Sequence, residues 1–99
     1  MSKRRSDISP SAGAATSAEF DMADFDDVVV HATSPTAVSN LVIEETLDAG
    51  TTWIQVATVA TAIGVAVRLA AVGPMATRCR WRFASGNGTA TRLQRVKSL

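Results

Sequence analysis

Apolar and polar residues alternate with the period of a β-strand in several segments between residues 27 and 96. The pattern is clearest over residues 77–84, where three apolar side chains alternate with three arginines. The apolar residues are Cys79, Trp81 and Phe83, and the arginines are Arg78, Arg80 and Arg82. Because successive side chains of a strand point to opposite sides of the sheet, one face of this strand is expected in the core. The other face is expected to carry a ladder of guanidinium groups.

Turn residues separate the alternating segments and predict a series of short antiparallel strands. The expected strands are 27–32, 38–46, 52–59, 65–70, 77–84 and 89–96. A tight turn at Asp48, Ala49 and Gly50 joins the second and third into a hairpin, because Gly50 can take a positive φ and Asp48 can bond nearby backbone. The predicted fold class is all-β, a small antiparallel β-sandwich or partly closed barrel of about six to seven strands, the seventh lying near Phe20.

The first 19 residues lack this period and are rich in Ser, Ala, Gly and Thr. The segment opens with Lys3, Arg4 and Arg5, and no apolar run of the length found in signal peptides follows them. We therefore expect a flexible basic N-terminal arm over residues 1–19 and a β-sandwich domain over residues 20–99. The three bases are candidate interaction residues for an acidic neighbour or nucleic acid, with a solvated tail as the alternative.

Charge is divided unevenly although the net charge is only +1. All nine acids lie at or before Asp48, whereas seven of the ten bases follow it. We expect an acidic edge and a basic sheet face through which subunits associate head to tail. The residues assigned to this contact are Asp24, Asp26 and Asp27 on the acidic side and Arg78, Arg80 and Arg82 on the basic side. In the alternative, the two surfaces neutralise each other within one subunit.

The sequence contains few residues in patterns suited to catalysis or metal binding. The chain has one histidine, His31, and one cysteine, Cys79, and its clustered aspartates lack the spacing of a calcium-binding loop. We assign no catalytic, cofactor-binding or metal-binding residue and expect no enzymatic activity. Residues 49–67 form a run of 19 residues without a charge, which raises a transmembrane helix as an alternative. Two glycines and several threonines in that run favour strands, so no membrane partner is expected.

Three segments carry a resemblance to a known class of protein. Residues 45–53, 80–83 and 86–89 read Glu-Thr-Leu-Asp-Ala-Gly-Thr-Thr-Trp, Arg-Trp-Arg-Phe and Gly-Asn-Gly-Thr. Over residues 38–96 this series resembles the small β-sandwich domains of tailed-phage virion structural proteins, although Ala49 stands where a glycine is more usual. Similar hairpins also occur in discoidin-like carbohydrate-binding sandwiches.

The resemblance implies a non-enzymatic virion structural protein that needs no cofactor. A capsid decoration (cement) protein is the first expectation and a neck or tail component the second. A carbohydrate-binding or nucleic-acid-binding sandwich is a further alternative. The expected partners are the major capsid protein or other virion proteins, together with further copies of this chain in a homo-oligomer. Nucleic acid is less favoured, because no exposed aromatic residues interleave the arginines. The expected location is the virion, after synthesis in the host cytoplasm.

Overall fold

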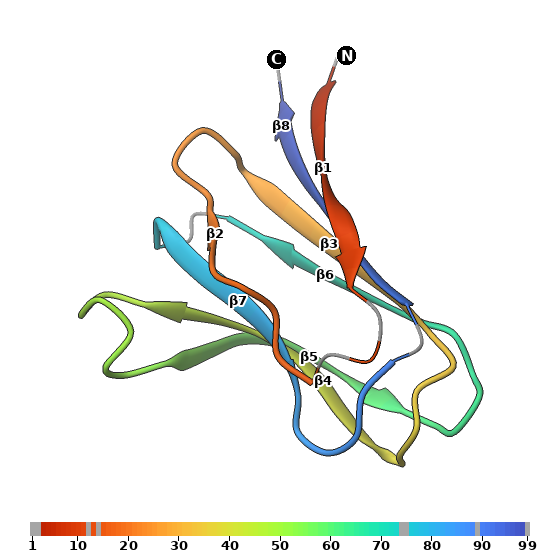
Figure 1. The fold of residues 1–99 in the computed structure, drawn as a ribbon. Coiled ribbons are helices and arrows are strands. Elements are labelled where there is room, and N and C mark those ends of the chain that lie inside the picture. Colours follow the sequence, from red (N-terminus) through yellow and green to blue (C-terminus); the bar gives the residue numbers. More distant parts are fainter. Residues whose placement is uncertain (1–2, 12, 14, 74–75, 89, 99) are drawn as a thin grey trace.

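The computed structural model describes residues 3–11, 13, 15–73, 76–88 and 90–98, and over these residues the chain forms eight strands (Figure 1). The strands are β1 (Lys3–Ser11), β2 (Phe20–Asp21), β3 (Asp27–Thr33), β4 (Ser39–Thr46), β5 (Ile54–Thr61), β6 (Val67–Val72), β7 (Arg78–Phe83) and β8 (Ala90–Ser98). Four strands in the order β1-β8-β3-β6 make sheet A, and four in the order β2-β7-β4-β5 make sheet B. All the pairings are antiparallel.

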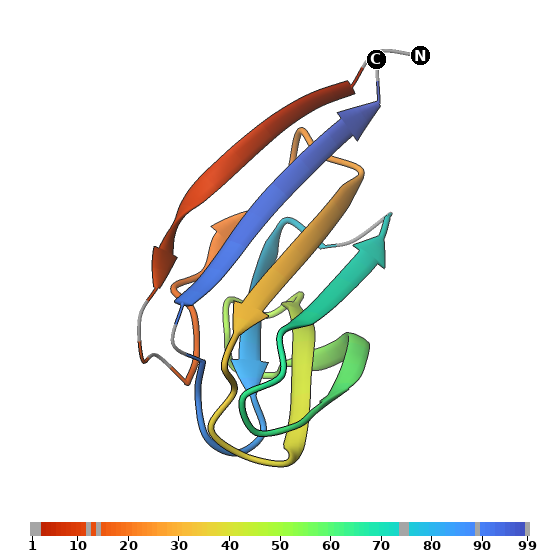
Figure 2. The same cartoon turned by 90° about the vertical axis from the view of Figure 1, so that its right-hand side faces the viewer.

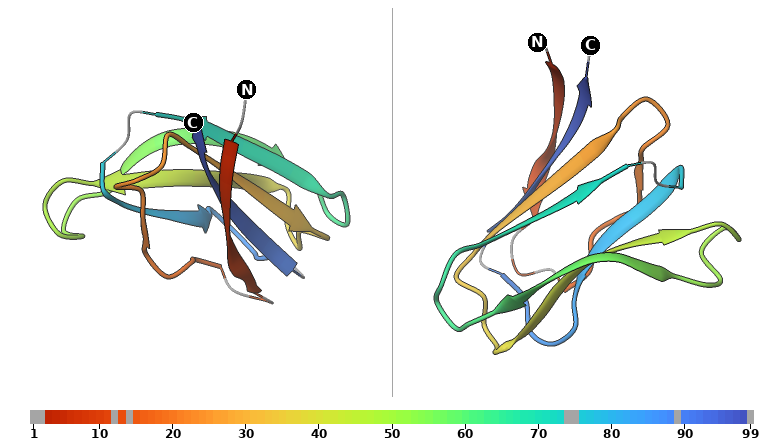
Figure 3. Two further views of the ribbon diagram at one scale, coloured as in Figure 1. Left: turned by 90° about the horizontal axis from the view of Figure 1, so that it is seen from above. Right: turned by 180° about the vertical axis from the view of Figure 1, so that it is seen from behind.

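The two sheets lie face to face as separate layers. Figure 2 shows the long strands of sheet A side by side, and Figure 3 shows both layers from above and from behind. The all-β prediction is therefore confirmed. Of the two architectures left open by the sequence, the structure is the sandwich, because the strands fall into two hydrogen-bonded sheets.

The core lies between the sheets and is built from the inward positions of alternating strands. In β7 the inward side chains are those of Cys79, Trp81 and Phe83, as the sequence pattern predicts. Trp81 is 2% exposed, and its ring meets that of Phe83 edge-on at a centroid distance of 5.8 Å. The other large buried side chains come from the centre of both sheets and include Leu41, Ile43, Val28, Val30 and Leu93. Burial of the inner face of each sheet against the other holds the layers together.

The predicted hairpin joins β4 to β5 and has a defined turn. The hydroxyl of Thr46 donates a hydrogen bond to Oδ1 of Asp48 at 2.8 Å, and the same Oδ1 accepts from the backbone N–H of Thr52 at 2.7 Å. Ala49 and Gly50 take φ values of 61° and 94°. Alanine at such a φ is strained, whereas glycine is not, so the turn depends on the hydrogen bonds made by Asp48.

The sequence predicted a flexible arm over residues 1–19, but Lys3–Ser11 forms a strand at the edge of sheet A. It runs antiparallel to β8, with Arg5 opposite Val96 and Ile8 opposite Leu93. The register shifts between Ile8 and Ser11, a stretch that contains Pro10, which lacks an N–H for the ladder. The pattern of side chains did not predict β1, because pairing along one edge requires backbone hydrogen bonds and no apolar period. The boundary between residues 19 and 20 is therefore not the start of the folded part of the chain.

Candidate interaction surfaces

The arginine ladder of β7 lies on the outer face of sheet B and surrounds one acid, Glu44. Glu44 stands on β4 directly opposite Arg80 in the register. Its Oε1 accepts hydrogen bonds from Nε of Arg80 at 3.0 Å and from Nε of Arg82 at 3.2 Å. Its Oε2 accepts from a terminal guanidinium nitrogen of Arg82 at 3.3 Å. Only 6% of Glu44 is exposed, so this carboxylate is held between two cations in a site of low water access.

Two opposing effects act on the pKa of Glu44. Burial raises the pKa, because it penalises the charged form. The hydrogen bonds from Arg82 and Arg80, with the positive charges of both groups, lower it by more, and the net effect is a pKa below 4.5, the ordinary value. Glu44 is therefore ionised at neutral pH and forms part of the folded structure.

The remaining parts of the ladder also have partners within the subunit. Nε of Arg78 donates to Oε1 of Glu19 at 2.6 Å. The guanidinium carbon of Arg80 lies 4.1 Å from the centre of the Trp53 ring, a cation–π contact. Arg78, Arg80 and Arg82 thus meet Glu19 and Glu44 of their own chain, and not the aspartates that the sequence paired with them. The ladder is thus neutralised within its own subunit, but by two glutamates outside the acidic edge that the sequence predicted.

The predicted acidic edge forms a short turn between β2 and β3, at one end of the sandwich (Figure 1). The N–H of Phe25 donates to the carbonyl of Met22 at 3.0 Å, and the N–H of Ala23 donates to Oδ1 of Asp21 at 2.7 Å. Asp24 lies within this turn and is exposed. We call residues 21–26 the acidic turn. Asp27, the first residue of β3, is half-buried opposite Val72 and Val96.

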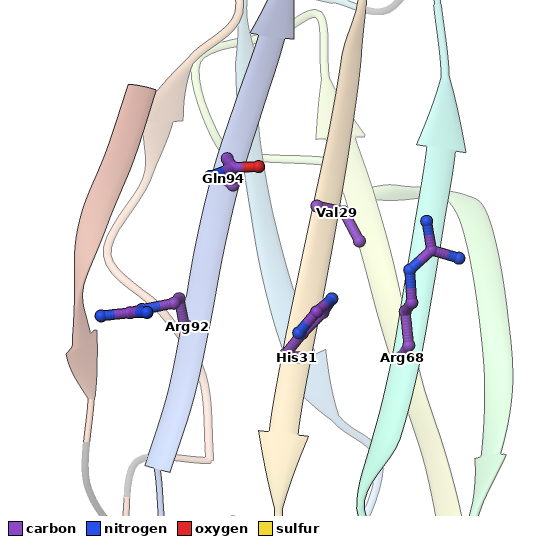
Figure 4. A pocket seen from close by; sticks show the side chains of 5 residues that line it. All are labelled: Val29, His31, Arg68, Arg92 and Gln94. Atoms are coloured by element: carbon purple, nitrogen blue, oxygen red, sulfur yellow. The ribbon is translucent and has the colours of Figure 1, made fainter. Parts of the chain in front are cut away.

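A second basic surface, which the sequence did not predict, lies on the outer face of sheet A. His31 on β3 is opposite Arg68 of β6 on one side and Arg92 of β8 on the other. All three are exposed, and with Val29 and Gln94 they line a shallow depression of about 340 Å³ (Figure 4). We call Arg68, His31 and Arg92 the basic row. Their positions in the sequence gave no signal, because the three strands are neighbours only in the folded sheet.

The other candidate bases, Lys3, Arg4 and Arg5, belong to β1. Their backbones lie opposite Ser98, Lys97 and Val96 of β8. They are therefore at the edge of sheet A, at the same end of the molecule as the two chain termini (Figure 1).

Exposed apolar side chains gather at two ends of the molecule. Leu47, which is 90% exposed, and Ile54 lie at the β4–β5 hairpin. Val38, Ile63 and Val65 lie at the other end, where the β5–β6 loop is tied to the β3–β4 loop by a hydrogen bond from Gly64 N–H to the Pro35 carbonyl at 2.9 Å. Grouped apolar side chains on a surface are typical of contacts with other proteins.

Strand β5 connects these two ends and is an open edge of sheet B. In the part of the chain that the structure describes, β5 pairs with β4 alone. Its sequence, Ile-Gln-Val-Ala-Thr-Val-Ala-Thr, holds neither a charge nor a proline over eight residues. The other edges are less suited to pairing: β1 contains charged residues and a proline, β2 has two residues, and β6 contains Arg68.

Metal binding and membrane insertion are two further possibilities on which the described residues bear. No group of three or more His, Cys, Asp and Glu side chains there could hold a metal ion. No helix in the same residues is long and apolar enough to cross a membrane. The charge-free run 49–67 instead makes most of the β4–β5 turn, β5 and the β5–β6 loop.

Comparison with known proteins supports the fold. No protein-family model matches the chain, and no curated protein matches it. Among solved structures, the SPBc2 prophage-derived protein YomS superposes with a TM-score of 0.70 at 9% sequence identity, over 98% of this chain and 96% of that one. A protein of the disulfide-linked pili that form Bacillus endospore appendages superposes with a TM-score of 0.54 at 19% identity, over 99% of this chain and 88% of that one. At these identities the likeness establishes a shared small β-sandwich architecture.

Proposed function

We propose that the protein is a non-enzymatic structural component of a phage-related particle, where it attaches to neighbouring protein subunits. Capsid decoration is the first form of this role, and a place in the neck or tail is the second. The fold likeness to a prophage-derived protein agrees with the resemblance found in the sequence. Neither likeness specifies a partner, so the proposal depends on the surface of this chain.

The observation that carries the proposal is the open edge of β5. A strand edge presents unpaired N–H and C=O groups, and soluble proteins normally protect long edges with charges, prolines or bulges. β5 has one register shift, between its pairs Ile43–Ala57 and Glu44–Gln55, but its eight residues carry no charge or proline and lie between two groups of exposed apolar side chains. An edge of this kind fits a partner that adds an extended strand to sheet B.

We assign this edge to an extended, uncharged segment of another particle protein. One loop joins β5 to β6, and the two strands diverge from each other away from that loop. Sheet A therefore does not cover the full length of the β5 edge (Figures 1 and 3). The exposed Ile54 and Ile63 at its two ends would pack against flanking residues of that segment. Backbone pairing would give the contact its affinity, and the apolar ends would fix its position along β5.

The proposal is tested by particle binding. Thr58→Lys with Ala60→Lys places two charges on exposed positions of β5, and a charged edge opposes strand addition. Ser85→Lys with Ala84→Lys is the matched control, because both residues are exposed in the β7–β8 turn and β4 lies between that part of the chain and β5. We expect the β5 variant to co-sediment with purified particles at least about tenfold more weakly than the control. Equal binding of the two variants would show that β5 is not the attachment edge.

The nucleic-acid alternative is weakened by the arginine ladder itself. Its three arginines are engaged with Glu19 and Glu44, so they would have to exchange these partners for phosphates. The carbohydrate alternative is weakened by Trp81 and Phe83, which are buried in the core and present no aromatic platform.

A further inference from the structure

We infer that the basic row of sheet A is the docking site for the acidic turn of a second copy of this chain, in a head-to-tail contact. The inference rests on the proposed structural role and specifies how copies contact one another within an assembly. It replaces the pairing of Asp24 with the arginine ladder, because the ladder has partners inside its own subunit.

The basic row differs from the arginine ladder in its contacts with the residues that the structure describes. The three arginines of the ladder bind carboxylates. Arg95 donates a hydrogen bond to the carbonyl of Asp21 at 2.8 Å and lies over the ring of Phe25. In the described part of the chain, neither Arg68 nor Arg92 makes a hydrogen bond or an ion pair. The fold thus engages these four arginines internally and leaves the two that flank His31 for a ligand outside the subunit.

The geometry of the row suits carboxylates. Neighbouring strands of a sheet lie about 5 Å apart, so the backbones of Arg68 and Arg92 are about 10 Å apart with His31 between them. Val29 and Gln94 also line the depression, and Figure 4 shows the guanidinium of Arg92 directed toward β1 and that of Arg68 lying along β6. Guanidinium groups bind carboxylates through two parallel hydrogen bonds, and an imidazole supplies one further donor. The backbone of Asp7 on β1 is opposite Gln94, two residues along β8 from Arg92.

The acidic turn is suited to enter such a depression because it projects and is held in one conformation. Its interior hydrogen bonds join Phe25 to Met22 and Ala23 to Asp21. Its two ends are fixed to different sheets, by Met22 N–H to the Thr77 carbonyl at 2.8 Å and by Asp26 N–H to the Val96 carbonyl at 2.9 Å. A preorganised turn loses little conformational entropy on binding, so its charges contribute more fully to affinity.

The turn cannot reach the basic row of its own subunit. It ends where β3 begins at Asp27, and His31 lies four residues further along the same strand, or about 13 Å away. The hydrogen bonds to Thr77 and Val96 prevent the turn from folding back over the sheet. Two complementary surfaces at different places on one molecule make a heterologous contact, which repeats from copy to copy and forms a ring or an extended array.

The test uses two variants that each remove one side of the contact. Arg68→Gln with Arg92→Gln removes the two positive charges of the row, and Asp21→Asn with Asp24→Asn removes two negative charges of the turn. Asparagine at position 21 keeps the oxygen that accepts from Ala23 N–H, so the turn is preserved. Ala84→Glu with Ser85→Glu changes the net charge by the same two units as the arginine variant, at exposed positions of another loop, and serves as the control.

In sedimentation velocity at about 50 mM NaCl, the natural protein and the control variant should both associate. Each contact variant alone should sediment as a monomer, because its self-association is at least about tenfold weaker than that of the natural protein. A mixture of the two contact variants should form a complex of two chains and nothing larger, because the mixture contains one intact row and one intact turn per pair. Association of the natural protein should be lost in about 0.5 M NaCl, where charges are screened over only a few ångströms.

The inference is overturned if the mixture stays monomeric or if the arginine variant associates like the natural protein. A dimer of the natural protein that persists in high salt would overturn it in favour of pairing between two β5 edges. Loss of binding to a DNA duplex by the arginine variant, with self-association unchanged, would overturn it in favour of nucleic acid. A protein that is monomeric in all salts but still found in particles would overturn this contact and leave the proposed function standing.

Discussion

Replacing Glu44 by Gln is the most informative single change, because it removes a buried charge from between two arginines. Glu44 accepts three hydrogen bonds from Arg80 and Arg82 at 3.0 to 3.3 Å and is 6% exposed. Gln has the same shape but carries no charge, and only its oxygen can accept. The substitution leaves two guanidinium groups near each other without a compensating carboxylate.

The magnitude follows from how deeply each partner is buried. Removing one partner of a fully buried ion pair costs about 3–5 kcal/mol. The side chains of Arg80 and Arg82 are 26% and 36% exposed, so water partly solvates them once the carboxylate is gone. We therefore expect Glu44→Gln to lower the free energy of unfolding by about 2–3 kcal/mol, or the melting temperature by roughly 10–20 °C in a domain of this size.

Urea denaturation followed by tryptophan fluorescence measures this difference. Glu19→Gln is the matched control, because Glu19 and Arg78 form an ion pair whose side chains are 41% and 45% exposed. Exposed pairs contribute about 0.2–1 kcal/mol, so the control should lose little stability. If the two substitutions cost the same, within about 0.5 kcal/mol, the carboxylate of Glu44 does not have the structural role assigned to it.

Four further predictions concern the fold. Trp81→Ala should lower the free energy of unfolding by about 3–5 kcal/mol, because the 2%-exposed indole fills the centre of the core; a urea midpoint unchanged from the natural protein would contradict this. Deleting residues 1–11 should lower the melting temperature by at least about 4–8 °C, because β1 covers the edge of β8; an unchanged scanning-calorimetry trace would restore the flexible arm. Cys79 should not react with an aromatic disulfide reagent at pH 8 until the protein unfolds, since burial, followed by the charges of Glu45 and Asp21, raises its pKa to about 11; rapid labelling of the native protein would refute this. Because the pKa of Glu44 is lowered in the folded state, its contribution should be complete above pH 4.5 and decline as the pH falls through the lower folded value; a stability gap between natural protein and Glu44→Gln that stays constant down to pH 2.5 would be inconsistent with that shift.

The strands that build the core could be predicted from the sequence because each has an apolar face. β7 is the clearest case, since the alternation of Cys79, Trp81 and Phe83 with arginines specifies both the strand and its inward face. The hairpin at Asp48 was equally accessible, because its turn chemistry is local. β1 was missed because its pairing with β8 depends on backbone hydrogen bonds between segments some 90 residues apart.

The surfaces could be predicted only in part, since they depend on which strands become neighbours. The division of charge correctly suggested that acids and bases meet, but Glu44 was not singled out as the partner of Arg80 and Arg82. That pairing requires the register of β4 on β7. Predicting the basic row would require the order of the strands in sheet A, where β3 lies between β6 and β8. Arg68 on β6 and Arg92 on β8 are far apart in the sequence.

The central claim, that this β-sandwich is a structural component of a phage-related particle, is tested most directly by the particles themselves. Particles assembled by the genome that encodes this chain would be purified with and without its coding sequence, then compared by mass spectrometry and negative-stain imaging. We predict that the protein is present in many copies per particle and that its removal deletes a defined feature of the particle surface, neck or tail. Its absence from purified particles, together with identical images of the two preparations, would contradict the claim.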